Sequence, residues 1–270
     1  MRKTGLFLAS IVLSATLWAE LPEKKGRDVI NRANAEAYIG FLASDALEGR
    51  EAGFRGGRIA GEYIVSNLKT MGIEPLFESY YQPFEAYNKE RQKKGRFQVH
   101  PDSIAKLKQG VHQKLSMNNI LGKIEGKNPN EYVIIGAHYD HLGFDPMLDG
   151  DRVYNGADDN ASGVSAVLQV AKAFLATGVQ PERTVIFAFW DGEEKGLLGS
   201  KYFVQTFLEM DKVKGYLNYD MIGRNKDESK PMHVVYFYTE AHPVFGDWLK
   251  NDIKKYGLNL TPDYRPWDKA

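Results

Sequence analysis

Apolar residues recur along the chain at two spacings, one typical of amphipathic helices and one typical of buried strands. The helical spacing predicts five helices, over residues 31–47, 58–71, 165–176, 199–208 and 243–256. Short runs rich in β-branched and aromatic residues predict strands over 119–124, 132–137, 184–190, 215–220 and 234–238. Strands that alternate with helices indicate an α/β domain with a mostly parallel sheet.

Glycine, proline and charge mark the segments between these elements. Residues 48–57 carry several glycines and charges and are predicted to form a loop, and Gly72 followed by Pro75 is a helix stop signal for 58–71. Residues 87–114 are basic and weakly periodic. We interpret them as a solvated surface excursion and not as an anion-binding patch.

Three of the predicted strands run directly into acidic or imidazole side chains. The strand over 132–137 is followed by His138-Tyr139-Asp140, the strand over 184–190 by Asp191-Gly192-Glu193-Glu194, and the last ends in Asn218-Tyr219-Asp220. Ligands of such sheets collect beyond the carboxyl ends of the strands. These side chains are therefore expected to meet at one edge of the sheet.

The residue types at this edge favour a metal site. His138 with Asp158, Glu193, Glu194 and Asp220 is a set of one imidazole and four carboxylates, and the chain has no cysteine. Such a set suits zinc or another divalent ion, and two ions would neutralise converging carboxylates. If the chain is still extended at His138, Asp140 projects to the same face and can orient its ring.

The balance of charged residues argues against two classes of binding partner. Lys plus Arg and Asp plus Glu both number 35, so nothing in the charge indicates a nucleic-acid or membrane-surface binder. A chain of 270 residues is consistent with one domain.

The first 19 residues have the pattern of a signal peptide. A basic start is followed by an apolar run from Leu6 to Trp18 and then Ala19, the expected cleavage point. The alternative is an uncleaved anchor. We expect residues 20–270 to form the mature domain, exported to the periplasm or secreted, with no membrane association after cleavage.

Four ordered blocks of sequence resemble the M28 family of zinc aminopeptidases, also called the aminopeptidase Y family. They are residues 136–140 (GAHYD), 155–163 (NGADDNASG), 193–200 (EEKGLLGS) and 218–221 (NYDM). The resemblance implies a three-layer α/β/α sandwich of the zinc-exopeptidase type, peptide substrates and a co-catalytic di-zinc site.

The resemblance also implies a role for each matching residue. His138 and Asp220 are expected to bind one zinc, Asp158 to bridge both ions, and Glu194 to bind the other. Glu193 is expected to be the general base and Asp140 to orient His138. A cis peptide bond is expected between Asp158 and Asp159.

One part of the family pattern has no counterpart in this chain. The second zinc of the family takes a histidine from near the end of the domain, and no block here matches it. We therefore expect the C-terminal part of the domain to be missing, one complete three-ligand site, at most about one tightly bound zinc, and impaired activity.

Two alternatives remain open from the sequence. One is a glutaminyl-cyclase-like acyltransferase with a single zinc, against which an intact His138 and Asp140 argue. The other is a non-catalytic, peptidase-like binding domain. His141 follows Asp140 and is expected to pack or to support a ligand, and not to bind metal, because an extended chain would point it to the opposite side.

Overall fold

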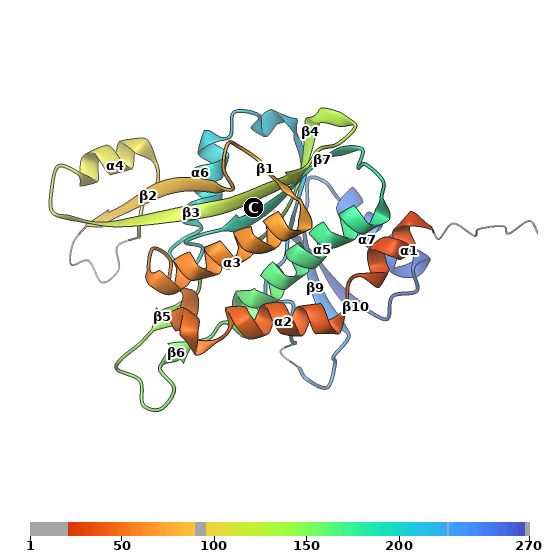
Figure 1. Cartoon of the computed structure of the whole chain (residues 1–270), viewed down its shortest axis with the longest axis horizontal. Helices are drawn as coiled ribbons and strands as arrows, with labels where there is room; N and C mark the ends of the chain where they lie inside the picture. The colour runs from red at the N-terminus through yellow and green to blue at the C-terminus, as the bar shows by residue number, and fades with distance from the viewer. Residues whose placement is uncertain (1–20, 90–95, 226, 268–270) are drawn as a thin grey trace, which may run out of the picture.

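The computed structural model describes residues 21–89, 96–225 and 227–267, so the predicted signal peptide lies outside the described part. Figure 1 shows a twisted sheet with helices on both sides. The helices are α1 Pro22–Asp28, α2 Arg32–Leu42, α3 Arg55–Met71, α4 Pro101–Leu107, α5 Gly163–Thr177, α6 Leu198–Thr206 and α7 Val244–Lys255. Within the described ranges, no helix is long and apolar enough to cross a bilayer.

The strands form one large sheet and two small ones. They are β1 Glu74–Pro75, β2 Tyr81–Lys89, β3 His112–Ile124, β4 Asn128–His138, β5 Gly143–Phe144, β6 Val153–Tyr154, β7 Arg183–Trp190, β8 Val213–Asn218, β9 His233–Thr239 and β10 Thr261–Trp267. The large sheet has the order β1-β3-β7-β4-β8, with β2 also paired to β3.

The large sheet is mixed. Strand β4 lies parallel to both β7 and β8, whereas β1, β2 and β7 pair with β3 in the antiparallel sense. The predicted α/β class with a mixed sheet is confirmed. Its parallel part is limited to β7, β4 and β8, and these are the strands whose carboxyl ends carry the predicted site.

Side chains of the central strands alternate between two apolar layers. Phe187 and Phe189 of β7 pack with residues of α3 and α5 on one face, and Ile186 and Trp190 pack with Phe203 of α6 on the other. Both layers are buried, so β4 and β7 are apolar on both faces, as expected of interior parallel strands. The predicted three-layer arrangement follows from these two cores.

Several predicted boundaries shift. The helix over 31–47 ends at Leu42, and a short 3-10 segment, Asp45–Arg50, follows it, with Glu48, Gly49 and Arg50 in the left-handed region. The helix over 58–71 begins earlier, at Arg55, and ends as predicted before Gly72, whose φ is 77°. Asn31 caps α2 by accepting a hydrogen bond from the Asn34 N–H.

The described residues of the predicted surface excursion over 87–114 are mostly exposed or half-buried, but they contain regular structure that the sequence analysis did not predict. The sequence analysis missed β2, and β3 begins at His112, seven residues before the predicted strand. The long β2–β3 pairing and α4 build an arm that extends from the sheet (Figure 1). The charged residues 90–95 lie outside the described residues.

Candidate metal centre

The parallel strands bring the predicted site residues together at one edge of the sheet. His138 is the last residue of β4, Glu193 and Glu194 follow β7, and Asp220 follows β8. A fourth segment, the single π-helical turn Ala157–Ser162 that leads into α5, contributes Asp159.

Two sets of three side chains in the described residues offer ligand atoms within 4.8 Å of one another, and Asp159 belongs to both. We call them the His138 group (His138, Asp159, Asp220) and the His141 group (His141, Asp159, Glu194).

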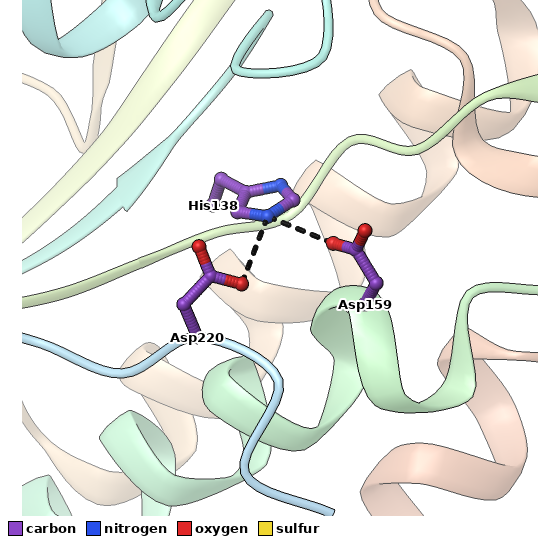
Figure 2. Close-up of side chains that lie close together, drawn as sticks. All are labelled: His138, Asp159 and Asp220. Atoms are coloured by element: carbon purple, nitrogen blue, oxygen red, sulfur yellow. Dashed lines mark ion pairs between the residues drawn. The ribbon is translucent and has the colours of Figure 1, made fainter. Parts of the chain in front are cut away.

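The His138 group is arranged around one imidazole nitrogen (Figure 2). His138 Nε2 lies 3.1 Å from Asp159 Oδ1 and 3.6 Å from Asp220 Oδ1. The His138 side chain is 3% exposed, whereas those of Asp159 and Asp220 are 33% and 39% exposed. The imidazole is thus fixed in the protein interior, while the two carboxylates reach it from the solvent side.

The carboxylates dominate the protonation of this imidazole in the metal-free protein. Burial lowers the pKa of His138, but its interactions with the nearby carboxylates of Asp140, Asp159 and Asp220 outweigh that effect and raise the pKa to about 12. The hydrogen bond to His138 likewise lowers the pKa of Asp159. The same carboxylates that raise the pKa of His138 carry the negative charge that a bound divalent cation would neutralise.

The His141 group is held by a hydrogen bond. His141 Nδ1 lies 2.6 Å from Glu194 Oε1 and 4.0 Å from Asp159 Oδ2. Both side chains of the close pair are largely buried, at 10% and 18% exposure.

The distances between ligand atoms show which of the two groups is better suited to bind a metal ion. Two ligand atoms about 2.0–2.1 Å from a tetrahedral zinc lie roughly 3.4 Å apart. The distances of 3.1 and 3.6 Å in the His138 group match that separation, and an imidazole with two carboxylates is a donor set suited to zinc. The 2.6 Å contact between His141 and Glu194 is too short for two ligands of one ion, so this hydrogen bond would have to open first.

Asp140 lies behind the His138 ring and is fully buried. Its Oδ1 is 3.6 Å from His138 Nδ1, and that nitrogen is 3.2 Å from the Asp140 main-chain oxygen. The same carboxylate accepts hydrogen bonds from the N–H groups of Glu193 (3.0 Å) and Glu194 (3.3 Å). Asp140 therefore connects the end of β4 to the acidic pair after β7.

Glu193 has the electrostatic surroundings of a proton acceptor. Burial raises its pKa, His138 opposes that rise, and Asp140, Asp220 and Glu194 add to it. A carboxylate whose pKa is moved toward neutrality by its site can take and return a proton at neutral pH.

Asp158 lies outside both groups. Its Oδ1 accepts a hydrogen bond from the Gly223 N–H at 2.7 Å, and its Oδ2 lies 3.8 Å from Arg224 Nε. The cis peptide bond joins Asp159 to Asn160, so its predicted position between Asp158 and Asp159 is wrong by one residue. The neighbouring Asp159 lies where the sequence analysis expected Asp158.

His141 is the residue that the sequence analysis set aside. The expectation assumed an extended chain beyond Asp140, but β4 ends at His138, and the alternation of a strand does not continue past its last residue. The only sequence signal for His141 was its spacing, because a second imidazole stands three residues after His138.

Comparison with known proteins places this site in a family. The profile of peptidase family M28 matches residues 119–269. Leupeptin-inactivating enzyme 1 of Streptomyces exfoliatus is 38% identical over 135 residues, which are 49% of this chain and 27% of that protein. An aminopeptidase of Pseudomonas aeruginosa is 38% identical over 115 residues, 42% of this chain and 19% of its own length.

Solved structures agree at the level of the fold. A zinc aminopeptidase from Bacillus subtilis superposes with a TM-score of 0.62 at 16% identity, covering 86% of this chain and 79% of that one. The matched segments span about a fifth to a quarter of the two relatives named above. Because the profile match covers more than half of the chain and includes all four segments of the site, the chain belongs to peptidase family M28.

Proposed function

We propose that this chain carries the catalytic site of a metal-dependent aminopeptidase that removes N-terminal residues from peptides. The observation that supports it most is the sharing of Asp159 between two groups of metal-ligand side chains at one sheet edge. A relative of 38% identity is named an aminopeptidase, and one of the similar folds is named a zinc aminopeptidase.

In this proposal the His138 group is the primary zinc site. Its two carboxylates lie at distances from His138 Nε2 that suit a tetrahedral zinc, and Asp140 supports the His138 ring from behind. Asp159, and not Asp158, then fills the position shared by two ions.

The His141 group is the secondary site of the proposal. Glu194 and Asp159 are its carboxylates, and His141 supplies the third side chain. Because the hydrogen bond between His141 and Glu194 competes with the metal, we expect the second ion to bind more weakly than the first. We still expect about one tightly bound zinc, and in this proposal its ligands are His138, Asp159 and Asp220.

The residues around these groups have separate roles in peptide hydrolysis. A bound zinc acts as a Lewis acid and lowers the pKa of water in its open position. Glu193 takes the proton of the attacking water and returns it to the leaving amine, since its pKa is raised by burial. Asp140 fixes the main chain of Glu193 through a 3.0 Å hydrogen bond and so aims this base.

The test is hydrolysis of leucyl-4-nitroanilide compared with its N-acetylated form, with the chain metal-depleted and then reloaded with zinc. We expect cleavage of the free-amine substrate only, lost on chelation and restored by zinc. Glu193→Gln is expected to keep its zinc and lose about a hundredfold or more in rate, because only the proton transfer is removed.

Glu182→Gln is the matched control, since Glu182 is exposed and lies just before the opposite end of β7. Activity that survives complete metal removal would overturn the proposal. Equal loss of zinc and rate in Glu193→Gln would make Glu193 a ligand and not the base.

The two alternatives have different outcomes in the same assays. An acyltransferase of the glutaminyl-cyclase type would release ammonia from an N-terminal glutaminyl peptide and leave leucyl-4-nitroanilide intact. A binding domain would do neither while still retaining the peptide. Export is a separate proposal, tested by N-terminal sequencing of the mature protein, which is expected to begin near Glu20.

A further inference from the structure

Arg50 is a fully buried arginine whose guanidinium is bound by main-chain carbonyl groups. It is 1% exposed and lies at the end of the 3-10 segment Asp45–Arg50. Its side chain donates hydrogen bonds to four carbonyl oxygens, those of Leu42, Tyr139, Asn155 and Gly156. No hydrogen bond from Arg50 to a carboxylate is found among the described residues.

Three of the four acceptors, all but Leu42 of α2, belong to segments that carry the metal ligands. Tyr139 stands between His138 and Asp140, and its oxygen is 2.9 Å from Arg50 Nε. Asn155 and Gly156 immediately precede the turn that carries Asp159, with contacts of 2.7 and 2.9 Å. One guanidinium therefore fixes the main chain on both sides of the gap between His138 and Asp159.

The backbone of Arg50 fixes a third point. Its carbonyl oxygen accepts a 3.1 Å hydrogen bond from the His141 N–H. Arg50 thus connects the main-chain N–H of His141 to the segment before Asp159, although Arg50 is itself a member of neither metal-ligand group.

Gly156 shows how closely these parts approach. A Cβ on Gly156 would lie 2.3 Å from the Asp159 main-chain oxygen, 2.6 Å from Arg50 Nη2 and 2.6 Å from His141 Cδ2, and the φ of Gly156 is +60°. Only glycine permits both the conformation and the contact.

The charge of Arg50 is retained inside the protein. Burial lowers its pKa to about 10, and the nearby carboxylates of Asp140, Asp159 and Glu194 counteract that effect. The side chain therefore remains a cation at neutral pH beside a cluster of acidic groups.

We infer that Arg50 is a positioning residue of the metal centre, which holds the His138 and Asp159 segments at the separation that the ion requires. Arginine suits this role because its rigid fork presents five N–H donors in fixed directions, whereas lysine offers three donors on one flexible atom. The inference rests on the proposed metal site and names a residue outside its ligands.

The experiment measures zinc affinity of the full chain by competition with a chromophoric chelator. Arg50→Lys keeps the positive charge but cannot reach four carbonyl groups, so we expect zinc affinity to fall by on the order of 10- to 100-fold, as for other residues that orient ligands. Arg58→Lys is the matched control, because Arg58 is an exposed arginine that also donates to a carbonyl, that of Gly53. It is expected to bind zinc like the wild type.

A second variant disturbs the same contact and leaves the arginine in place. Gly156→Ala places a methyl group against Arg50, His141 and the Asp159 main-chain oxygen, and it is also expected to lower zinc affinity. Both variants are compared only as proteins whose circular dichroism matches the wild type. If Arg50→Lys proves too unstable for this comparison, Arg50→Gln takes its place, since glutamine keeps two N–H donors at this position.

The outcomes separate this inference from the proposed function. Wild-type zinc affinity in Arg50→Lys or in a folded Gly156→Ala would overturn the positioning role and leave the aminopeptidase proposal standing. A wild-type chain that binds no divalent metal would overturn both.

Discussion

Substitution of each member of the adjacent pair Asp158 and Asp159 by asparagine is the sharpest test of the metal centre. The two residues are neighbours in one turn, but only the Asp159 carboxylate lies in the His138 and His141 groups. The Asp158 carboxylate instead accepts a hydrogen bond from the Gly223 N–H. The pair is therefore its own matched control.

The expected magnitudes differ widely. Asp159→Asn removes a charged ligand from both groups, so we expect zinc affinity to fall by about a hundredfold or more, which is roughly 2.8 kcal/mol of binding free energy. In Asp158→Asn the amide oxygen can still accept the Gly223 hydrogen bond, and the lost ion pair with Arg224 is long (3.8 Å) and involves an arginine that is 76% exposed. Such a pair contributes about 0–1 kcal/mol to stability. Asp158→Asn should therefore change zinc affinity by less than about fivefold.

The assay is zinc competition with a chromophoric chelator, supported by metal analysis after gel filtration of each variant. The reverse order of affinities, with Asp158→Asn the defective protein, would refute the assignment made from the structure. It would restore the position expected from the family pattern. Equal defects would mean that the turn Ala157–Ser162, and not one carboxylate, controls the site.

Three further predictions concern groups around the site. Asp140→Asn should weaken zinc binding by roughly 10- to 100-fold and lower the free energy of unfolding by about 1–3 kcal/mol, because one of two backbone N–H groups loses its acceptor. Denaturant unfolding measures the loss of stability, and Asp145→Asn, in an exposed turn, is the control. Zinc binding at pH 7.5 should release a proton from His138, whose pKa is about 12 without metal, and calorimetry that shows no buffer dependence would contradict this. Burial raises the pKa of Asp191 to about 7, so its ionisation makes the fold less stable as pH rises from about 4 to 7. Asp191→Asn should remove this pH dependence. Relative to the wild type, the free energy of unfolding of the variant should therefore be higher at pH 8 than at pH 4 by up to about 4 kcal/mol, as measured by urea unfolding.

The strand ends were predictable because they depend on local signals. The apolar run before His138 and the run before Asp191 are both long enough to be buried strands, and parallel neighbours necessarily end at the same edge. The stop of α3 at Gly72 was equally local, since a left-handed residue ends a helix wherever it falls. These features required no knowledge of distant contacts.

The parts that were missed depend on contacts between distant segments. Strand β2 contains Pro83 and charged residues, and it is stable because it pairs with β3 over nine residues. Its sequence alone therefore gives a weak signal. The extension of β3 back to His112 has the same origin, because its first residues are half exposed and are ordered by β2.

The local sequence pattern also does not indicate which of Asp158 and Asp159 faces the metal-ligand groups. Both follow Gly156 in the same turn, and which carboxylate faces His138 depends on how that turn is anchored. Arg50, more than a hundred residues earlier, binds the carbonyl groups of Asn155 and Gly156, and Gly223 binds Asp158 from the other side.

The same anchoring explains how so many acidic groups remain together in the metal-free fold. Asp140, Asp159 and Glu194 would repel one another, and each has a fixed partner: backbone N–H groups for Asp140, His138 for Asp159 and His141 for Glu194. The raised pKa of His138 and the buried cation of Arg50 both place positive charge near these carboxylates. In the proposed site, zinc would replace the proton of His138 and leave Arg50 in place, and we expect Arg50 to position the ligand segments independently of the ion. We therefore expect the site to lose zinc affinity when the hydrogen bonds from Arg50 to the main-chain carbonyl groups are removed, even if every metal ligand is retained.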